Sequence, residues 1–350
     1  FLYFPTYFSG LECTQIMVHD GFSVMKRNKR HINIILGIFA LSILAVFIAT
    51  NWDTKENGHP QEKHKNSTQL KVVKESLDYC SLNLTKWMVR HHNETGVIII
   101  TPTYSRPEQF PELIRLSYIF KQVPNLIWIL VEDRRGCSDG IARFLEAANI
   151  SHVHLASPMP EVYRKKHFLP RGVSGRRAGL KWVRSNAKNL SNSVIYFGDD
   201  DNFFTLELFS EIKKTKHVSM FPVGFVGDYS ISSPIVRENK IVGFYDGWNG
   251  GRKFAVDMAG FAVNIEVLLA HPNASMPYWA GHEEDQFLQS LDINMQDLEP
   301  LASNCTQILV WHTKTVKNKK PKLRLKMNEK KSNLEKLLSN MAAMSMAIYP

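Results

Sequence analysis

The sequence predicts an α/β fold whose mainly parallel sheet has helices on both faces. Three apolar runs carry this prediction: 97–101, 126–131 and 194–197. They are rich in β-branched or aromatic residues and contain no charge, as expected for strands that are buried on both faces. Segments with helical spacing lie between them, and this alternation is typical of parallel strands joined by crossover helices.

The expected elements follow each other in a regular order up to Asp201. Leu113, Leu116 and Phe120 share one face of the first helix. The order is strand 97–101, helix 107–121, strand 126–131, helix 139–148, strand 152–155, helix 174–188 and strand 194–197. Ligands bind such sheets outside the carboxyl ends of the strands, which points to Pro102–Tyr104, Asp133 and Asp199–Asp201.

The pattern changes after Asp201, where glycines separate short candidate strands. Helical segments are expected near 264–271 and 283–290, and a closing strand is expected at 307–311. We therefore predict a second subdomain that shares the sheet.

The charge of the chain is unevenly distributed. The 350 residues include 43 Lys and Arg and 33 Asp and Glu, for a net charge of +10. A basic protein is a candidate for nucleic-acid binding. Here, however, the excess lies in two short segments, 26–31 and 314–331, while 96–313 is nearly neutral. We predict no nucleic-acid partner.

The apolar run 32–49 predicts a membrane anchor. Its 18 residues carry no charge and would form a helix of about 27 Å, close to the thickness of a bilayer core. Basic residues precede the run, so the positive-inside rule predicts a single-pass type II protein with a lumenal C-terminus. We expect a cytosolic tail at 1–31, an anchor at 32–50 and a stem at 51–92. Met25 is a candidate start, which would leave 1–24 untranslated.

Sequons and cysteines fit a lumenal chain. Seven Asn-X-Ser/Thr sequons follow the anchor, at Asn66, Asn83, Asn93, Asn149, Asn189, Asn273 and Asn304. In an oxidising compartment, one pair among Cys80, Cys137 and Cys305 can form a disulfide. The sequence does not say which pair, and a free or intermolecular cysteine is equally compatible with it.

Three adjacent carboxylates, Asp199 to Asp201, follow the strand 194–197. Like charges at this spacing repel each other unless a cation or hydrogen-bond donors neutralise them. Oxygen ligands suit Mg²⁺ or Mn²⁺, which usually also bridge substrate phosphates. A solvated acidic loop or a helix N-cap is the alternative, but the position at a sheet edge favours a metal site.

Two basic segments are candidates for phosphate binding. The turn 171–177 places Arg171 and Arg176 at the start of a helix, where backbone N–H groups and guanidinium groups suit phosphate. An exposed basic turn is the alternative. His312 and Lys314 follow the closing strand and also suit a phosphate, with a structural edge histidine as the alternative.

The acidic segment 281–285 offers a candidate general base. The alternative is a helix N-terminus, where the dipole favours acidic residues. No zinc-binding spacing surrounds His282. Walker A, GxSxG and Rossmann glycine motifs are also missing from the sequence. Together with the three aspartates, this points to nucleotide-sugar chemistry.

The motifs, in this order, resemble those of the β-1,3-glucuronosyltransferases. These Golgi enzymes transfer glucuronic acid from UDP-glucuronate onto galactose. The resemblance covers roughly 96–315 and rests on segments 101–104, 130–133, 170–173, 196–202, 222–224, 256–263, 281–284, 297–300, 304–306 and 310–313. It implies a nucleotide-sugar glycosyltransferase (GT-A-like) fold, a donor subdomain at 93–201, an acceptor subdomain at 202–315 and a basic tail at 316–350.

The resemblance also implies roles for individual residues. The donor would contact Pro102, Tyr104, Asp133, Arg171, Arg176, Asp199, Asp200, Asp201, His312 and Lys314. Mn²⁺ would bind at Asp201. The glucuronate and acceptor sites would include Trp248, Arg252 and Asp257, and Glu284 would be the general base of an inverting displacement. Compared with the family pattern, one extra residue lies between Glu284 and Glu299, so the adjacent Glu283 is the alternative base, although the alignment favours Glu284. The resemblance further implies a Golgi membrane protein that acts as a homodimer.

Two departures from the family pattern bear on the substrate. Lys314 stands where the family usually has arginine, so a bidentate contact becomes a point charge. Ser232 stands where characterised members have a glutamate that helps to bind the acceptor. We expect transfer to the proteoglycan linkage region Gal-Gal-Xyl. Transfer to the terminal galactose of N-acetyllactosamine is the alternative, and an inactive glycan-binding relative is a remote one.

Overall fold

The computed structural model describes residues 78–88, 94–227, 229–248 and 250–313, together with five positions between 333 and 339. The predicted cytosolic tail, the anchor at 32–50, Lys314 and most of the tail at 316–350 lie outside the described residues. Among the helices that are described, none combines the length and the apolar character needed to cross a bilayer.

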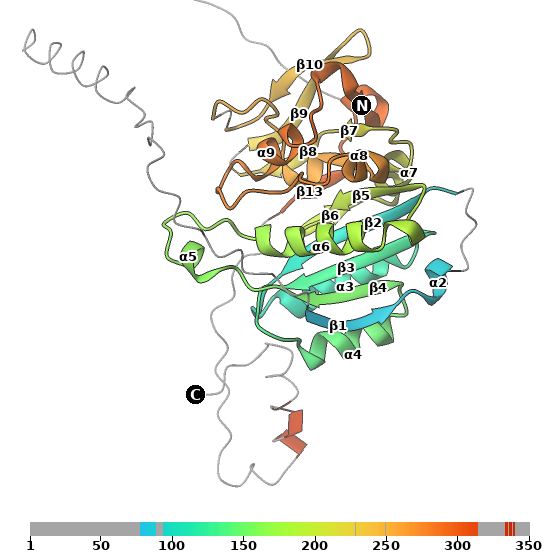
Figure 1. Cartoon of the computed structure of the whole chain (residues 1–350), viewed down its shortest axis with the longest axis vertical. Coiled ribbons are helices and arrows are strands. Elements are labelled where there is room, and N and C mark those ends of the chain that lie inside the picture. Colours follow the sequence, from blue (N-terminus) through green and yellow to red (C-terminus); the bar gives the residue numbers. More distant parts are fainter. Residues whose placement is uncertain are drawn as a thin grey trace, which may run out of the picture. The chain divides into compact units, whose positions relative to one another are not determined.

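A mixed sheet of eight strands forms the centre of the described part (Figure 1). Its order is β1 (Asp78–Asn83), β4 (His152–Ala156), β3 (Leu126–Glu132), β2 (Gly96–Thr103), β5 (Ser193–Phe197), β11 (Phe261–Asn264), β7 (Val218–Met220) and β12 (Leu298–Pro300). The four strands β4, β3, β2 and β5 are parallel. This half confirms the predicted alternation of strands and helices.

The other strands correct the prediction of a mainly parallel sheet. β1 is antiparallel to β4, and β11 is antiparallel to both β5 and β7. β11 and β7 contain only four and three residues. Strand direction cannot be inferred from such short segments because no crossover helix fixes it. The predicted subdomain boundaries stay predictions, although the sheet itself runs through both segments.

Helices pack on the two faces of the parallel half. α6 (Val173–Ser185) lies in front of the strands in Figure 1 and shares a core with Ile98 and Ile100 of β2. The alternate residues Val97 and Ile99 belong to the core shared with α3 (Gln109–Phe120) and α4 (Asp139–Ala148). β2 is therefore buried on both faces, as its apolar sequence predicts.

Close packing of α6 on β2 depends on Gly179. A Cβ atom at this position would lie 2.6 Å from the side chain of Ile100, which is closer than packed carbon atoms approach. The helix thus reaches the sheet closely enough to bring its N-terminal turn to the carboxyl ends of the strands.

A second, mostly antiparallel sheet closes the fold. Its order is β10 (Lys240–Tyr245), β9 (Tyr229–Arg237), β8 (Val223–Val226), β13 (Val310–His312) and β6 (Asn202–Phe204). The predicted helices near 264–271 and 283–290 are α8 (Ile265–Ala270) and α9 (Glu283–Gln289). The other short helices are α2 (Thr85–Met88), α5 (Glu161–Arg164), α7 (Leu206–Ile212) and α10 (Leu301–Cys305).

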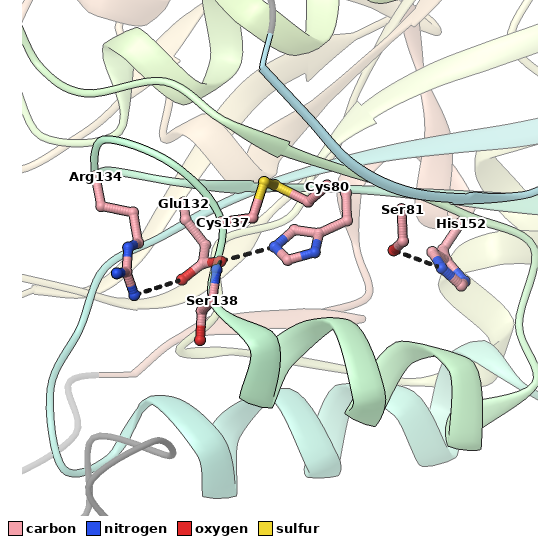
Figure 2. Close-up of a disulfide and its surroundings, with 8 residues drawn as sticks. Cys80, Ser81, Glu132, Arg134, Cys137, Ser138 and His152 are labelled. Atoms are coloured by element: carbon pink, nitrogen blue, oxygen red, sulfur yellow. Dashed lines mark hydrogen bonds and ion pairs between the residues drawn. A yellow bond between two sulfur atoms is a disulfide. The ribbon is translucent and has the colours of Figure 1, made fainter.

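The predicted stem at 51–92 requires a correction because β1 lies within it. Asp78–Asn83 pairs along the edge of the sheet with β4. A disulfide joins Cys80 of β1 to Cys137, in the loop after β3 (Figure 2). β1 is an edge strand with several polar residues, so its sequence lacks the apolar signal of a buried strand.

Near the disulfide, a buried carboxylate holds the loop after β3 in place (Figure 2). Glu132 accepts a hydrogen bond from the backbone N–H of Ser138, at 3.0 Å, and pairs with Nε2 of His154 at 2.7 Å. The side chains of Glu132 and His154 are almost fully buried. The disulfide and this pair hold the loop that begins at Asp133. Cys305 is half-buried and forms no disulfide with the other described cysteines.

Candidate active site

A cavity of about 610 Å³ opens where the carboxyl ends of β2, β3 and β5 meet the N-terminal turn of α6 and His312 of β13. Strands β3 and β4 lie on one side of β2 and β5 lies on the other, so this edge is a topological switch point, where α/β sheets bind ligands. Nine residues predicted to contact the donor line it: Pro102, Tyr104, Asp133, Arg171, Arg176, Asp199, Asp200, Asp201 and His312. Lys314 lies outside the described residues.

Two of the three adjacent aspartates are paired with arginines. Both oxygens of Asp200 accept hydrogen bonds from Arg106, at 2.7 and 2.8 Å, and one also accepts from the Thr103 hydroxyl at 2.6 Å. Asp199 accepts from Arg176 at 2.5 Å. Sequence reasoning missed Arg106. The only sequence signal that links it to the site is its position three residues after the end of β2.

Asp201 differs from its two neighbours. No described residue donates a hydrogen bond to its carboxylate, while its backbone carbonyl accepts one from Thr313 at 2.6 Å. Burial, together with the charges of Asp199 and Asp200, raises the pKa of Asp201 to about 6. A bound cation would relieve this repulsion.

The residues around Asp201 fit a hard divalent cation that is completed by the substrate. Within the described residues, no three His, Cys, Asp or Glu side chains gather into a metal site. Magnesium and similar ions are often held by one or two carboxylates, with phosphate oxygens and waters filling the remaining positions. Asp201 lines a cavity that also contains arginines, and its carboxylate receives no hydrogen bond from the described residues, which matches that pattern.

The turn that starts α6 places Arg176 inside the fold. Gly172 precedes the helix with φ of 76°, and a Cβ atom there would lie 2.7 Å from Nη1 of Arg176. Arg176 is 5% exposed, and its Nε atom has no hydrogen-bond partner among the described residues. Arg171 is exposed and lies 5.6 Å from the ring centre of Tyr104. The two arginines thus approach the cavity from different depths.

Asp133 follows β3, whereas Asp199 and Asp200 follow β5. β2 lies between these two strands, so the carboxylates come from different sides of it. The carboxylate of Asp133 accepts hydrogen bonds from the backbone N–H of Met159, at 2.7 Å, and from Arg164, at 2.5 Å. Tyr104 follows β2 and lies beneath Arg106, 4.6 Å from the guanidinium carbon to the ring centre. A planar ring and a carboxylate at neighbouring strand ends suit a nucleobase, which presents both a flat face and hydrogen-bonding edges.

His312 is fixed by Asp257, with 2.7 Å between Nδ1 and the carboxylate. Burial lowers the pKa of His312, but the hydrogen bond and the charge of Asp257 outweigh burial and raise it to about 9. Burial raises the pKa of Asp257, yet the His312 contact dominates and lowers it. At neutral pH this gives a positively charged imidazole at the cavity wall and an ionised Asp257.

Glu284 is the second residue of α9 and lies in its first turn. It is half-buried, and burial together with the charges of Glu283 and Asp257 raises its pKa to about 8. Both Glu283 and Glu284 feel the positive charge of Arg176, which pairs with Asp199. The charge of Arg176 therefore acts both on Asp199, which lines the cavity, and on the candidate base Glu284.

The predicted acceptor residues Trp248 and Arg252 are held by Asp246, a residue that sequence reasoning missed. Asp246 accepts hydrogen bonds from Arg252 at 2.8 Å, from the backbone N–H of Trp248 at 2.9 Å and from the Ser232 hydroxyl at 2.5 Å. Arg252 lies over the Trp248 ring at 4.8 Å. Trp248, Arg252, Asp257 and Glu284 do not line the cavity itself.

Known proteins are similar in sequence to most of the described part of the chain. Residues 116–316 match the model of glycosyltransferase family 43. The chain is 47% identical over 250 residues to galactosylgalactosylxylosylprotein 3-beta-glucuronosyltransferase S of Drosophila melanogaster, covering 71% of this chain and 61% of that relative. It is 46% identical over 229 residues to galactosylgalactosylxylosylprotein 3-beta-glucuronosyltransferase 2 of Mus musculus, covering 63% of this chain and 69% of the relative.

A more distant relative matches over a longer stretch. Galactosylgalactosylxylosylprotein 3-beta-glucuronosyltransferase sqv-8 of Caenorhabditis elegans is 36% identical over 285 residues, covering 79% of this chain and 80% of the relative. The chain spans 61% and 49% of the length of the two Drosophila relatives that it matches.

Likeness to solved structures is weak. S. aureus TarS matches with a TM-score of 0.41 and 13% identity, covering 63% of this chain and 60% of that chain, which is too little to support an argument. The assignment to a family therefore rests on the match to the family model and on the sequence relatives. The chain belongs to glycosyltransferase family 43, and its mixed α/β sheet agrees with the GT-A-like fold expected from the sequence.

Proposed function

We propose that the chain transfers glucuronic acid from UDP-glucuronate to the 3-hydroxyl of a terminal galactose, with inversion at the anomeric carbon. One observation carries the proposal: a cavity with arginines and carboxylates at a sheet switch point is connected through Arg176 to Glu284, whose pKa is about 8. The names of the relatives, galactosylgalactosylxylosylprotein 3-beta-glucuronosyltransferases, support it.

The donor would lie along the cavity with its uridine between Pro102, Tyr104 and Asp133. Arg171, Arg176 and the charged His312 supply positive charge for the diphosphate, and such donors are strongest where water is excluded. Asp199 and Asp200 orient Arg176 and Arg106 by direct pairing. Lys314, beyond the described residues, would add a further charge for the phosphates.

Glu284 would act as the general base. Its carboxylate removes the proton from the galactose O3, and O3 forms a bond to C1 of glucuronate as the bond between C1 and the UDP oxygen breaks. The electron pair of that bond leaves with UDP. A single displacement of this kind inverts the anomeric configuration. Arg176 and His312 stabilise the charge that develops on the departing diphosphate.

Asp201 would hold a divalent cation, and we propose Mn²⁺. When bound, the ion would offset the negative charge on the leaving UDP. The support is the chemistry of the site. Within the described part of the chain no residue donates to the carboxylate of Asp201, and burial together with the charges of Asp199 and Asp200 raises its pKa to about 6.

The acceptor is proposed to be the Gal-Gal-Xyl linkage region, after the names of the relatives. A second acceptor, terminal galactose of N-acetyllactosamine on glycoprotein or glycolipid, is favoured by one observation. Ser232 is 2% exposed and donates its hydroxyl to Asp246, so its side chain is not directed to a ligand. Acceptor recognition would then rest on Trp248, Arg252 and Asp257.

We further propose a Golgi, single-pass type II membrane protein whose catalytic part is lumenal and homodimeric. The uncharged run 32–49 and the basic residues before it support this topology. The disulfide between Cys80 and Cys137 is compatible with an oxidising compartment.

Glucuronate transfer by the full chain tests the proposal. UDP release from UDP-glucuronate is measured with Mn²⁺ on Gal-Gal-Xyl and on N-acetyllactosamine, with a chelator control. Glu284→Gln should lower kcat by at least about a hundredfold, the usual contribution of general acid–base catalysis. UDP binding should be unchanged because Glu284 does not line the cavity.

The matched control is Glu283→Gln, a buried carboxylate one position earlier in the same helix turn. It should retain most of the activity. Full activity of Glu284→Gln with loss in Glu283→Gln would transfer the base role to Glu283. No transfer by the unaltered chain to either acceptor would refute the proposed function.

A further inference from the structure

Trp279 is a large apolar side chain left in solvent next to the catalytic helix. It is 55% exposed and lies four residues before Glu283, where α9 begins. Its ring stacks on the imidazole of His282, with 3.8 Å between ring centres and 28° between planes. The imidazole of His282 therefore covers one face of the indole, and more than half of the Trp279 side chain stays accessible to solvent.

His282 connects Trp279 to a second exposed tryptophan. The imidazole also contacts the Trp248 ring edge to face, at 5.2 Å and 75°. Trp248 is 48% exposed. We call these three residues, Trp248, His282 and Trp279, the aromatic row. The row presents two indoles joined through one imidazole.

The aromatic row is held in place by its surroundings. The backbone N–H of His282 donates to the carbonyl of Trp279 at 3.1 Å, which closes the turn between them. Gly281 has φ of 83°, and a Cβ atom there would lie 2.9 Å from the Trp248 ring, so only glycine permits this contact. Arg252 packs on Trp248 from its own loop. Binding to such a row would cost little side-chain entropy.

The aromatic row adjoins the helix turn that carries the proposed base. Glu284 is two residues after His282 and lies in the first turn of α9. Since His282 is the N-cap residue of the same helix, we expect a galactose whose O3 is within reach of Glu284 to lie close to the aromatic row. The next sugar of the same glycan must continue along or away from this surface.

We propose that Trp279 forms a second sugar subsite, which binds the residue adjoining the reacting galactose of an oligosaccharide acceptor. The inference rests on the proposed function. A hexose has a face of C–H groups that carry slight positive charge, and such groups pack on the negative face of an aromatic ring. Its hydroxyls remain at the rim in contact with water. An exposed, oriented indole beside the base suits this ligand class.

The experiment compares acceptors of different length with the full chain. The value of kcat/KM is measured for methyl β-galactoside, which has one sugar, and for a Gal-Gal disaccharide. Trp279→Ala should lower kcat/KM for the disaccharide about five- to tenfold, since stacking on an aromatic ring contributes on the order of one kcal/mol. The monosaccharide should be affected less than about twofold.

Two further variants control for folding. Trp279→Phe keeps a flat ring and should recover most of the disaccharide activity. Tyr118→Ala removes an aromatic ring that is 65% exposed on α3 and does not line the cavity, and it should leave both acceptors unchanged. Equal losses on both acceptors in Trp279→Ala would overturn the subsite. So would unchanged kinetics together with a shift in oligomeric state, which would make the row a contact between copies.

Failure of the proposed function is distinguishable from failure of the subsite. If the unaltered chain transfers to neither acceptor, the proposed activity is wrong. Binding of the Gal-Gal disaccharide, measured by saturation-transfer NMR in the presence of UDP, then tests the subsite alone. Signal that is lost in Trp279→Ala and kept in Tyr118→Ala supports it, and signal that is equal in both variants or absent refutes it.

Discussion

Glu284 has the surroundings of a group that titrates near neutral pH. It is half-buried, and two other carboxylates, Glu283 and Asp257, oppose its ionisation. Arg176 acts in the opposite direction but is shared with Asp199. The balance places the pKa of Glu284 at about 8, which suits a base that must accept a proton and later release it.

The pH dependence of transfer should therefore follow Glu284. A general base works only when it is ionised, so kcat should rise with pH and level off above about 8. Glu283→Gln removes one of the charges that raise the pKa of Glu284, so its profile should shift to lower pH. A pH series of kcat for both proteins measures this. Identical midpoints would show that Glu283 does not act on the titrating group.

At the residue scale, the sequence predicted the members of the site better than their contacts. Asp133 and Asp199 follow strands of the parallel half, whose carboxyl ends meet at one edge, whereas His312 ends β13 of the second sheet. Asp246 could not be found in this way. It joins Ser232 of β9 to Trp248 and Arg252 in the loop after β10. Hydrogen bonds across a hairpin leave no period in the sequence.

At the scale of single elements, burial determined which strands the sequence revealed. β2 and β3 are covered on both faces and read as continuous apolar runs. β1 carries the polar residues Ser81 and Asn83 because it forms the edge of the sheet. Its place depends on pairing with β4 and on the disulfide to Cys137, and neither is visible in a local pattern.

The disulfide should contribute strongly to stability. It closes a loop between positions 57 apart in sequence, and such a link restricts the unfolded chain. Replacing Cys80 and Cys137 together by serine should lower the free energy of unfolding by about 2–4 kcal/mol. Urea denaturation measures the change. Cys305→Ser is the control, because Cys305 is half-buried and pairs with no other cysteine that the structure describes. A loss as large in this control would show that the disulfide is not the cause.

At the scale of the whole molecule, one sheet joins the two predicted subdomains. β5 of the donor half pairs with β11 of the acceptor half, with Ala262 opposite Tyr196. β11 in turn pairs with β7. Backbone hydrogen bonds therefore run without interruption between the halves, unlike the sparse contacts of a typical linker between domains.

This continuity predicts a single cooperative unfolding transition for the catalytic part. Calorimetry of the full chain in detergent should give one main heat-absorption peak. UDP with Mn²⁺ should move the whole peak to higher temperature, since ligands that bind only the folded state stabilise it. Asp201→Asn should reduce that shift to the one seen with UDP and chelator. Two separate peaks, with only one moved by UDP, would contradict a shared unit.

The last described strand has a consequence for the order in which the site is built. β13 pairs with β6, directly after the three aspartates, and its His312 contacts Asp257 while Thr313 binds the backbone of Asp201. Because synthesis proceeds from the N-terminus, the parallel half leaves the ribosome long before this strand does. A nascent chain can thus hold nearly all the donor-binding residues and still lack a finished cavity. We therefore expect activity only after β13 (Val310–His312) has been synthesised, so a product whose translation stops before this strand would be folded in part but inactive.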